Sequence, residues 1–426
     1  MTYDYLDLNS IALELTDEHE ALKQTLRRFA AENLRPAAVE LDKMTPEEVI
    51  EEGSLFWETM KKMHKNGYHT IFIPEDFGGI GLDPISFHIL CEEFSYASIG
   101  FAVALGVDTF PTFFGTIVAA ERPELQETII KPFVEDMECK LTGCWAITEP
   151  AHGSDILMSE TPFFRDPKIT HQVVGKKKGS EWIINGQKSA WVSCGPTASQ
   201  AALFFGIDPS MGMAGGAIAI VDLTQEGVTK AKPLNKLGQR ELPQGEIYFD
   251  NARIPDQWVI CDQESYEEMT SLILGVANAG MATYALGGAR AAFEEALTYS
   301  RERVQGGRPI CEHQDVQAKL ANMFIKVEAS RQLSRAVMNY NMTSYPPRTE
   351  YSVTSKVFCT RAAFEVVSDA MQIFGGYGLS KEYLIEKLFR DIRATLIEDG
   401  SNESLSLVIA NKILAEDLGY GTGTGW

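Results

Sequence analysis

The feature that most constrains the fold of this chain is a change of sequence pattern at two points, near residues 141 and 262. Between these points, short apolar runs are separated by Gly, Pro, Asn and Asp, which is typical of β-strands joined by turns. On both sides, apolar residues recur three and four positions apart, as they do along amphipathic helices. We therefore predict an α+β fold in which a β domain lies between two helical parts.

A chain of 426 residues exceeds one ordinary hydrophobic core, so the three parts are predicted to be separate domains. Their predicted bounds are 1–140 for an N-terminal α-helical domain, 141–262 for a middle β-barrel or sandwich, and 263–426 for a C-terminal helical bundle. The clearest predicted strands are residues 182–184, 201–205, 217–221 and 247–249. The clearest helical stripes are Leu22, Leu26, Phe29 and Ala30, then Val316, Leu320, Met323 and Val327, and finally Val357, Phe364, Val367, Met371 and Phe374.

Charge and composition exclude several classes of partner. A formal net charge of −21 repels polyanions, so no nucleic acid is expected as a partner. We find no apolar run long enough to span a bilayer, and the first ten residues, MTYDYLDLNS, are acidic and unlike a signal peptide. We therefore expect a cytoplasmic protein without a membrane partner. The seven Cys residues have no paired spacing, which favours free thiols and no metal site.

Several stretches match one known family in the same order along nearly the whole chain. They are PEDFGG (74–79), CWAITEPAHGSD (144–155), INGQKSAWVS (184–193), LGQRELPQGEIYFDNARIP (237–255), ERVQGGRPICEHQ (302–314), DAMQIFGGYG (369–378) and IEDGSNE (397–403). The glycines of PEDFGG do not follow a predicted strand and do not open a helix, as the glycines of a dinucleotide-binding fold must, so that fold is not predicted. The set as a whole resembles the acyl-CoA dehydrogenases, whose C-terminal domain is a four-helix bundle.

This resemblance implies an enzyme that binds FAD and oxidises an acyl-CoA substrate. A carboxylate removes the weakly acidic proton alpha to the thioester carbonyl, while hydrogen-bond donors stabilise the charge that develops on the carbonyl oxygen. The beta hydrogen leaves as a hydride to flavin N5, a step for which the protein supplies orientation and burial. The family also implies a homotetramer and electron-transferring flavoprotein as the electron acceptor.

The resemblance assigns cofactor contacts residue by residue. In the middle domain they are Trp145, Ile147, Thr148, Ser154, Trp191 and Ser193. In the C-terminal domain, Arg303 and Gln314 would reach the FAD of a neighbouring subunit, and Arg suits phosphate because its planar fork makes two bonds. The loop that would form the matching surface on the partner side contains Gln372, Gly375 and Gly376. The segment after the predicted catalytic carboxylate adds Ser401 and Glu403.

Two departures from the family pattern affect these assignments. The spacing from Lys188 to Trp191 is one residue longer than in the family, so the alternative that Trp191 is only a core aromatic stays open. Gly306 stands where the family has a Phe, so one packing contact with the cofactor is in doubt.

The turn IEDGSNE puts Asp399 at the place of the family's catalytic Glu, with an arm one methylene shorter. A shorter arm changes the distance to the substrate carbon or suits a bulkier acyl group. Some members place the base where this chain has Ala277 and Asn278, neither of which can act as a base. The predicted substrate contacts are Ser154, Asn278 and Gly400.

A second carboxylate, Asp108, lies in the apolar stretch GFAVALGVDTFPTFFG, which borders the acyl pocket in the family. A buried charge costs free energy unless it is paired or functional, so Asp108 is a candidate catalytic residue. An N-cap for a helix that starts at Thr109 is the structural alternative. Two carboxylates in one pocket, together with the longer segment 157–171, fit the branch that forms dienes from cyclic substrates such as cyclohexene-carboxyl-CoA.

Other functions on the same fold stay open. An acyl-CoA oxidase or a lyase-like flavoprotein would use the same cofactor for a different outcome. A non-catalytic flavin- or CoA-binding protein would not need a base, so the carboxylate at Asp399 counts against it.

Overall fold

The computed structural model describes residues 15–159 and 161–417, without the side chains of 415–417. A helical part, a set of strands and a second helical part follow one another, as predicted. The chain forms two compact units, which divide it differently from the three predicted segments. Unit 1 contains the residues up to Val39, then Asp83–Ile99 and Gly275–Glu398, and unit 2 contains Glu40–Leu82, Gly100–Leu274 and the residues from Asp399 onward.

Some of the N-terminal helices begin after residues whose side chains cap them. Thr16 accepts a hydrogen bond from the backbone N–H of His19, and Asp83 accepts bonds from the N–H groups of Ile85 and Ser86. These caps fix the starts of α2 and α6. The helices of this part are α2 (Asp17–Phe29), α3 (Arg35–Leu41), α4 (Pro46–Ile50), α5 (Leu55–Lys65), α6 (Pro84–Ala97), α7 (Ile99–Val118) and α8 (Lys131–Val134), with π-helical turns at Ala30–Leu34 and Gln126–Ile130.

The middle part is an eight-stranded sheet in unit 2, and all four predicted strands are confirmed within it. The strands follow the order β6-β7-β3-β2-β4-β5-β8, and β1 pairs in parallel with β4. β4 and β5 are buried along nearly their whole length, whereas β7 alternates between buried and exposed residues. The strands are β1 (Gly143–Ala146), β2 (Val174–Lys178), β3 (Glu181–Lys188), β4 (Gln200–Gly206), β5 (Gly216–Asp222), β6 (Val228–Lys230), β7 (Ile247–Pro255) and β8 (Val259–Cys261).

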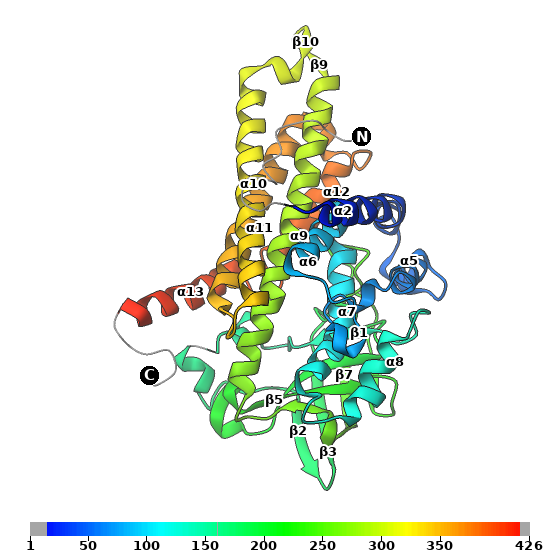
Figure 1. Ribbon diagram of the computed structural model, residues 1–426, viewed down its shortest axis with the longest axis vertical. Coiled ribbons are helices and arrows are strands. Elements are labelled where there is room, and N and C mark those ends of the chain that lie inside the picture. Colours follow the sequence, from blue (N-terminus) through cyan, green and yellow to red (C-terminus); the bar gives the residue numbers. More distant parts are fainter. Residues whose placement is uncertain (1–14, 160, 418–426) are drawn as a thin grey trace. The chain divides into compact units, whose positions relative to one another are not determined.

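Unit 1 is a helical bundle in which α10 and α11 lie side by side (Figure 1). The predicted stripes face its core, since Met323, Val327 and Val367 are buried. Helix α6 packs against α2 and α10. The C-terminal elements are α9 (Tyr266–Glu302), the hairpin β9 (Val304–Gln305) and β10 (Arg308–Pro309), α10 (Gln314–Thr343), α11 (Thr349–Phe374), α12 (Leu384–Thr395) and α13 (Asn402–Asp417).

Buried ion pairs join three helices of this bundle. The Arg290 guanidinium lies 2.7 Å from Glu92 Oε1 and 2.8 Å from Glu93 Oε2, and Arg331 lies 3.0 Å from Glu92 Oε1. Burial by itself disfavours the carboxylate of Glu92, but the charges of Arg331 and Arg290 hold its pKa well below its usual range. These pairs fix how α6, α9 and α10 meet, because a buried charge without its partner is costly.

Two of the described helices, α7 and α9, are long and apolar enough to cross a membrane, which corrects the expectation that no such run exists. Most of the apolar stretch in each helix is buried, however: 83% in α7 and 89% in α9. A helix that is apolar on all sides and buried in this way is typical of the core of a folded protein.

Candidate active site

The predicted base lies in a tight turn between α12 and α13. Asp399 has a positive φ of 54°, and the next residue, Gly400, has a φ of 102°. Asp is one of the few residues with a side chain that enter the left-handed region, and such conformations persist where the surroundings hold them. The Asp399 side chain is half-buried, whereas Gly400 is buried against Leu405 and Leu157.

This turn is bonded to the loop that carries the predicted flavin and substrate contact Ser154. The backbone N–H of Ser401 donates to Ser154 Oγ at 2.9 Å, although the two residues are 247 positions apart. Ser401 Oγ also accepts a bond from the N–H of Ser404, in the first turn of α13. Glu403 lies exposed in that same turn. The Ser154 hydroxyl therefore bonds the backbone of Ser401, immediately before a 16-residue helix, and the start of such a helix favours anions.

The segment after β1 presents the next predicted cofactor contacts. The Trp145 side chain is a core residue, 7% exposed, with its ring 5.5 Å from that of Phe110 and 6.2 Å from that of Phe204. The Trp145 indole is therefore packed into the core of unit 2. Ile147 is buried and Thr148 is half-buried at the end of the strand.

Trp191 follows β3 and is not a core aromatic, because 57% of its surface is exposed. The residue added relative to the family spacing falls in the turn at Ala190 and Trp191, after β3 ends at Lys188. Ser193 Oγ accepts a hydrogen bond of 3.0 Å from Gln244 Nε2, which ties this segment to the one that precedes β7. The exposed Trp191 indole offers a flat apolar surface with a polar N–H edge.

A buried ion pair that the sequence did not single out connects these two segments. Lys188 Nζ donates to the carbonyl of Ile147 at 2.9 Å and to Glu149 Oε1 at 2.7 Å, and both side chains are 0% exposed. The backbone N–H of Ser189 donates to the carbonyl of Thr148 at 2.9 Å. Glu149 and Lys188 stand in the two motifs that suggested the cofactor site, but nothing in their spacing indicates that they pair.

Asp108 lies in the middle of α7, so the alternative that it caps a helix starting at Thr109 is wrong. It is 1% exposed, and both of its oxygens are engaged. Oδ2 lies 2.9 Å from His64 Nε2, and Oδ1 accepts a bond of 2.7 Å from the N–H of Gly143, the first residue of β1. His64 Nδ1 bonds the carbonyl of Asp136 at 2.8 Å. The carboxylate therefore joins α5, α7 and β1.

The remaining predicted contacts belong to unit 1. Arg303 is exposed, and its guanidinium lies 5.3 Å from the centre of the Tyr377 ring, in the turn that follows Gly375 and Gly376. Gln314 and Gln372 are also exposed, at the first residue of α10 and near the end of α11. Asn278 is 0% exposed inside α9.

The departure at Gly306 has a backbone cause. Gly306 and Gly307 form the loop of the β9–β10 hairpin, with φ angles of 65° and 82°, and Gln305 pairs with Arg308 across it. A two-residue hairpin loop with both φ angles positive strongly favours glycine. A Phe at this position would therefore strain this turn.

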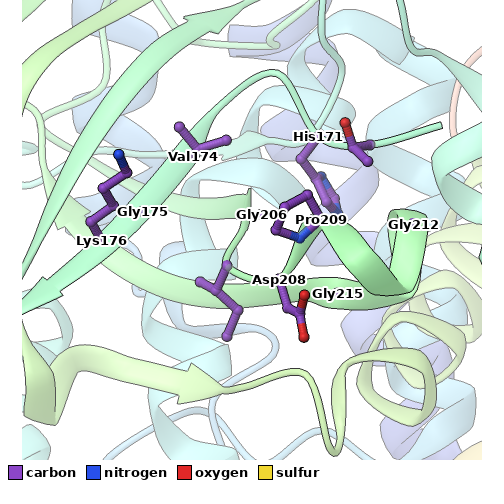
Figure 2. Close-up of a pocket in the computed structure, with 11 residues that line it drawn as sticks. His171, Val174, Gly175, Lys176, Gly206, Asp208, Pro209, Gly212 and Gly215 are labelled. Carbon is purple, nitrogen blue, oxygen red and sulfur yellow. The ribbon is translucent and has the colours of Figure 1, made fainter. Parts of the chain in front are cut away.

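A small pocket of about 170 Å³ lies in unit 2, at the ends of β2 and β4 and beside the 3₁₀ segment Pro209–Gly215 (Figure 2). Asp208, one of its lining residues, is already bonded to the N–H and hydroxyl of Ser210. Pockets for small-molecule ligands usually measure about 300–1,000 Å³. This pocket is too small for a CoA thioester, so we do not assign the acyl group to it.

Comparison with known proteins places the chain in a family. Sequence models of the acyl-CoA dehydrogenase N-terminal, middle and C-terminal domains match residues 16–136, 144–252 and 269–414. The 3-(aryl)acrylate reductase of Clostridium sporogenes is 32% identical over 94% of this chain and 99% of its own length. The chain therefore belongs to the acyl-CoA dehydrogenase family. Members are flavin-dependent oxidoreductases that act on CH–CH bonds, and this protein is an enzyme of that class.

Solved structures agree with this assignment. Butyryl-CoA dehydrogenase of Megasphaera elsdenii has a TM-score of 0.82 at 26% identity, over 94% of this chain and 99% of its own. A chain from work on the electron transferring flavoprotein of Acidaminococcus fermentans has a TM-score of 0.82 at 28% identity, with the same coverage. The predicted fold class is thus confirmed.

The residues of unit 2 fit a flavin. The exposed Trp191 indole suits an aromatic ring system, and the half-buried Thr148 hydroxyl can bond a polar ring edge. Ser401, which precedes α13, and the Ser154 hydroxyl bonded to it suit a phosphate group. A bound flavin would supply the hydride acceptor, whereas the residues of this chain supply its binding and orientation.

Proposed function

We propose that this protein is an FAD-dependent acyl-CoA dehydrogenase in which Asp399 removes the proton alpha to the thioester carbonyl. The bond from Ser401 N–H to Ser154 Oγ carries this proposal, because it joins the turn of the base to the loop of the predicted flavin and substrate contacts. Both segments belong to unit 2, so their connection lies within one compact body.

The geometry of the turn supports Asp399 rather than its neighbour Glu398 as the base. Adjacent side chains in a turn point in different directions, so only one of them can face a given substrate carbon. Asp399 is held at a positive φ between the ends of two helices, and this backbone conformation fixes the position from which its short side chain extends. Backbone N–H groups at the start of α13 and the hydroxyls beside them would orient the bound molecules.

The nature of the acyl group and of the electron acceptor belongs to the same proposal. The name of the Clostridium sporogenes relative, 3-(aryl)acrylate reductase, supports an acyl group that carries a ring, as does the shorter arm of Asp399. A cyclic thioester such as cyclohexene-carboxyl-CoA is the form we propose to test first. The structural relative from work on electron transferring flavoprotein supports a protein of that class as the acceptor.

The experiment that tests the proposal is anaerobic reduction of the flavin. Wild-type protein mixed with a reducing acyl-CoA should lose its visible flavin absorbance, and Asp399→Asn should bind the thioester without this bleaching, because the amide keeps the shape and loses basicity. We expect a decrease in the rate of flavin reduction of at least about 10²-fold, within the range for removing a general base.

Two comparisons make this experiment decisive. Asp399→Glu restores the longer arm of the family and should retain reduction, with a shift toward linear acyl-CoAs. Full reduction by Asp399→Asn with every thioester of a linear and cyclic panel would end the assignment of the base. A wild-type protein that converts a thioester without reduced flavin accumulating would instead favour a lyase-like reaction. Rapid reoxidation of the reduced flavin when oxygen is then admitted would favour an oxidase.

A further inference from the structure

The two segments proposed to contact the flavin in unit 2 come from strands that are not neighbours in the sheet. β1, which leads to Ile147 and Thr148, pairs with β4. β3, which leads to Trp191 and Ser193, lies between β2 and β7. Among the described strands, no pairing therefore joins β1 and β3 directly.

Lys188 and Ser189 join the two segments at the end of β3. The ammonium group of Lys188 bonds the Ile147 carbonyl, and the Ser189 N–H bonds the Thr148 carbonyl. Trp191 follows only two residues after Ser189, and its backbone N–H bonds Ser189 Oγ at 3.4 Å. The orientation of the first segment is thus linked directly to the start of the second.

Glu149 holds the Lys188 ammonium in place. Its Oε1 accepts the bond from Lys188 and one of 3.1 Å from the N–H of Val173, and its Oε2 accepts one of 2.6 Å from the N–H of Gln172. Burial disfavours its charge, yet the charge and hydrogen bond of Lys188 and the Gln172 N–H lower the pKa of Glu149 below its usual value. Burial lowers the pKa of Lys188, which the charge of Glu149 opposes.

A buried ion pair adds little net stability, since well-packed apolar residues of similar volume often stabilise a protein equally well. What this pair provides is directed bonding, because the Ile147 carbonyl and the Glu149 carboxylate both converge on one ammonium group. Its geometry therefore constrains the backbone at the end of β1.

We infer that Lys188 and Glu149 are positioning residues that set the spacing and orientation of the two flavin-binding segments, Ile147–Thr148 and Trp191–Ser193. The inference rests on the proposed function, which gives those segments their role. The pair acts through the backbone that it holds, because both side chains are 0% exposed and cannot contact a ligand themselves.

The test is FAD binding by the full-length apoprotein, followed by the quenching of flavin fluorescence. Lys188→Met removes the bonds to Ile147 and Glu149, and the dissociation constant for FAD should rise at least about tenfold, a loss of about 1.4 kcal/mol in binding free energy. The visible absorption bands of the flavin that still binds should shift, because the polar contacts of its ring change. The double variant Lys188→Met/Glu149→Gln removes both charges and should show the same effects if the single variant fails to fold.

Phe205→Leu is the matched control, because Phe205 is 0% exposed in β4 of the same sheet and lies in neither segment. If the pair has a purely structural role, Lys188→Met and the double variant should bind FAD as tightly as Phe205→Leu does. The comparison is made between variants that have lost the same amount of thermal stability. That result, with an unshifted flavin spectrum, would overturn the inference while leaving the proposed function intact. Failure of the wild-type protein to bind FAD would overturn the proposed function instead.

Discussion

At the scale of single residues, the contacts of Asp108 define a buried charge pair with a pH dependence. Burial by itself would lower the pKa of His64, but the hydrogen bond and charge of Asp108 and the carbonyl of Asp136 raise it above its ordinary value of 6.5. A histidine whose pKa is raised in the folded state contributes stability that is fully present below the unfolded pKa. This contribution is lost as the pH rises through the folded pKa.

We therefore expect Asp108→Asn to lower the free energy of unfolding by about 3 kcal/mol near pH 6, because it weakens a buried pair, with a smaller loss near pH 9. Urea unfolding followed by circular dichroism at both pH values measures this difference. Asp250→Asn changes an exposed carboxylate of the same unit and should have little effect at either pH. An equal loss for Asp108→Asn at both values would contradict the role assigned to the His64 pair.

The same variant separates the structural role of Asp108 from a catalytic one, which stays a prediction. A substrate proton would have to compete at Asp108 with the existing bonds to His64 and Gly143. Unchanged flavin reduction by folded Asp108→Asn with cyclic and linear thioesters would assign the residue to structure. A loss confined to cyclic thioesters would support the second base.

At the scale of elements, the close contact between β1 and α7 positions the first segment proposed to bind the flavin. A Cβ atom on Gly143 would lie 2.1 Å from the carbonyl oxygen of Asp108 and 2.8 Å from Cδ of Pro111. Only glycine permits this approach without a shift of the strand or the helix. The segment at Ile147 would move with β1 if the strand were displaced.

We expect Gly143→Ala to lower the free energy of unfolding by about 2 kcal/mol through overpacking. Thermal unfolding of the apoprotein is the measurement. Gly115→Ala, in α7, is the control. Its Cβ would lie 3.5 Å from Ile220, an ordinary contact, and Ala is the better helix former by up to about 1 kcal/mol. Equal melting temperatures for the two variants would show that β1 can move away from α7 at no cost.

At the scale of the whole molecule, the predicted contacts of unit 1 concern assembly. Arg303 lies over Tyr377 and is exposed, so its charge is available to a group outside the unit. The family resemblance gives it the FAD of a neighbouring subunit, and we propose a homotetramer on that basis. Arg303→Ala should then weaken FAD retention at least about tenfold through loss of charge-assisted hydrogen bonds, while the far-ultraviolet circular dichroism stays unchanged.

Arg308→Ala is the matched control, since Arg308 is an exposed arginine in the hairpin that follows Arg303 directly. Flavin content after gel filtration and sedimentation velocity measure the two parts of this prediction. Retention of FAD by Arg303→Ala equal to that of Arg308→Ala would remove Arg303 from the cofactor site. A monomeric holoenzyme with full FAD content would remove the cross-subunit arrangement altogether.

The sequence by itself determined the order of helices and strands in this protein. The apolar runs that became β3, β4, β5 and β7 and the stripes of α10 and α11 are local patterns, and local burial is sufficient to specify them. The motifs also indicated the family and, by alignment, the candidate base Asp399. These inferences need only neighbouring positions or matched spacings.

Only the tertiary structure decided which distant polar groups meet. Asp108 and His64 are 44 residues apart, Lys188 and Glu149 are 39, and Ser154 and Ser401 are 247. An apolar residue is buried by any packed neighbour, so its periodicity is visible in the sequence, whereas a buried charge requires one partner at one distance and angle. That partner is chosen by the packing of whole elements. The same reason explains why α2 and α6 belong to the C-terminal bundle, although the sequence places them in the N-terminal part.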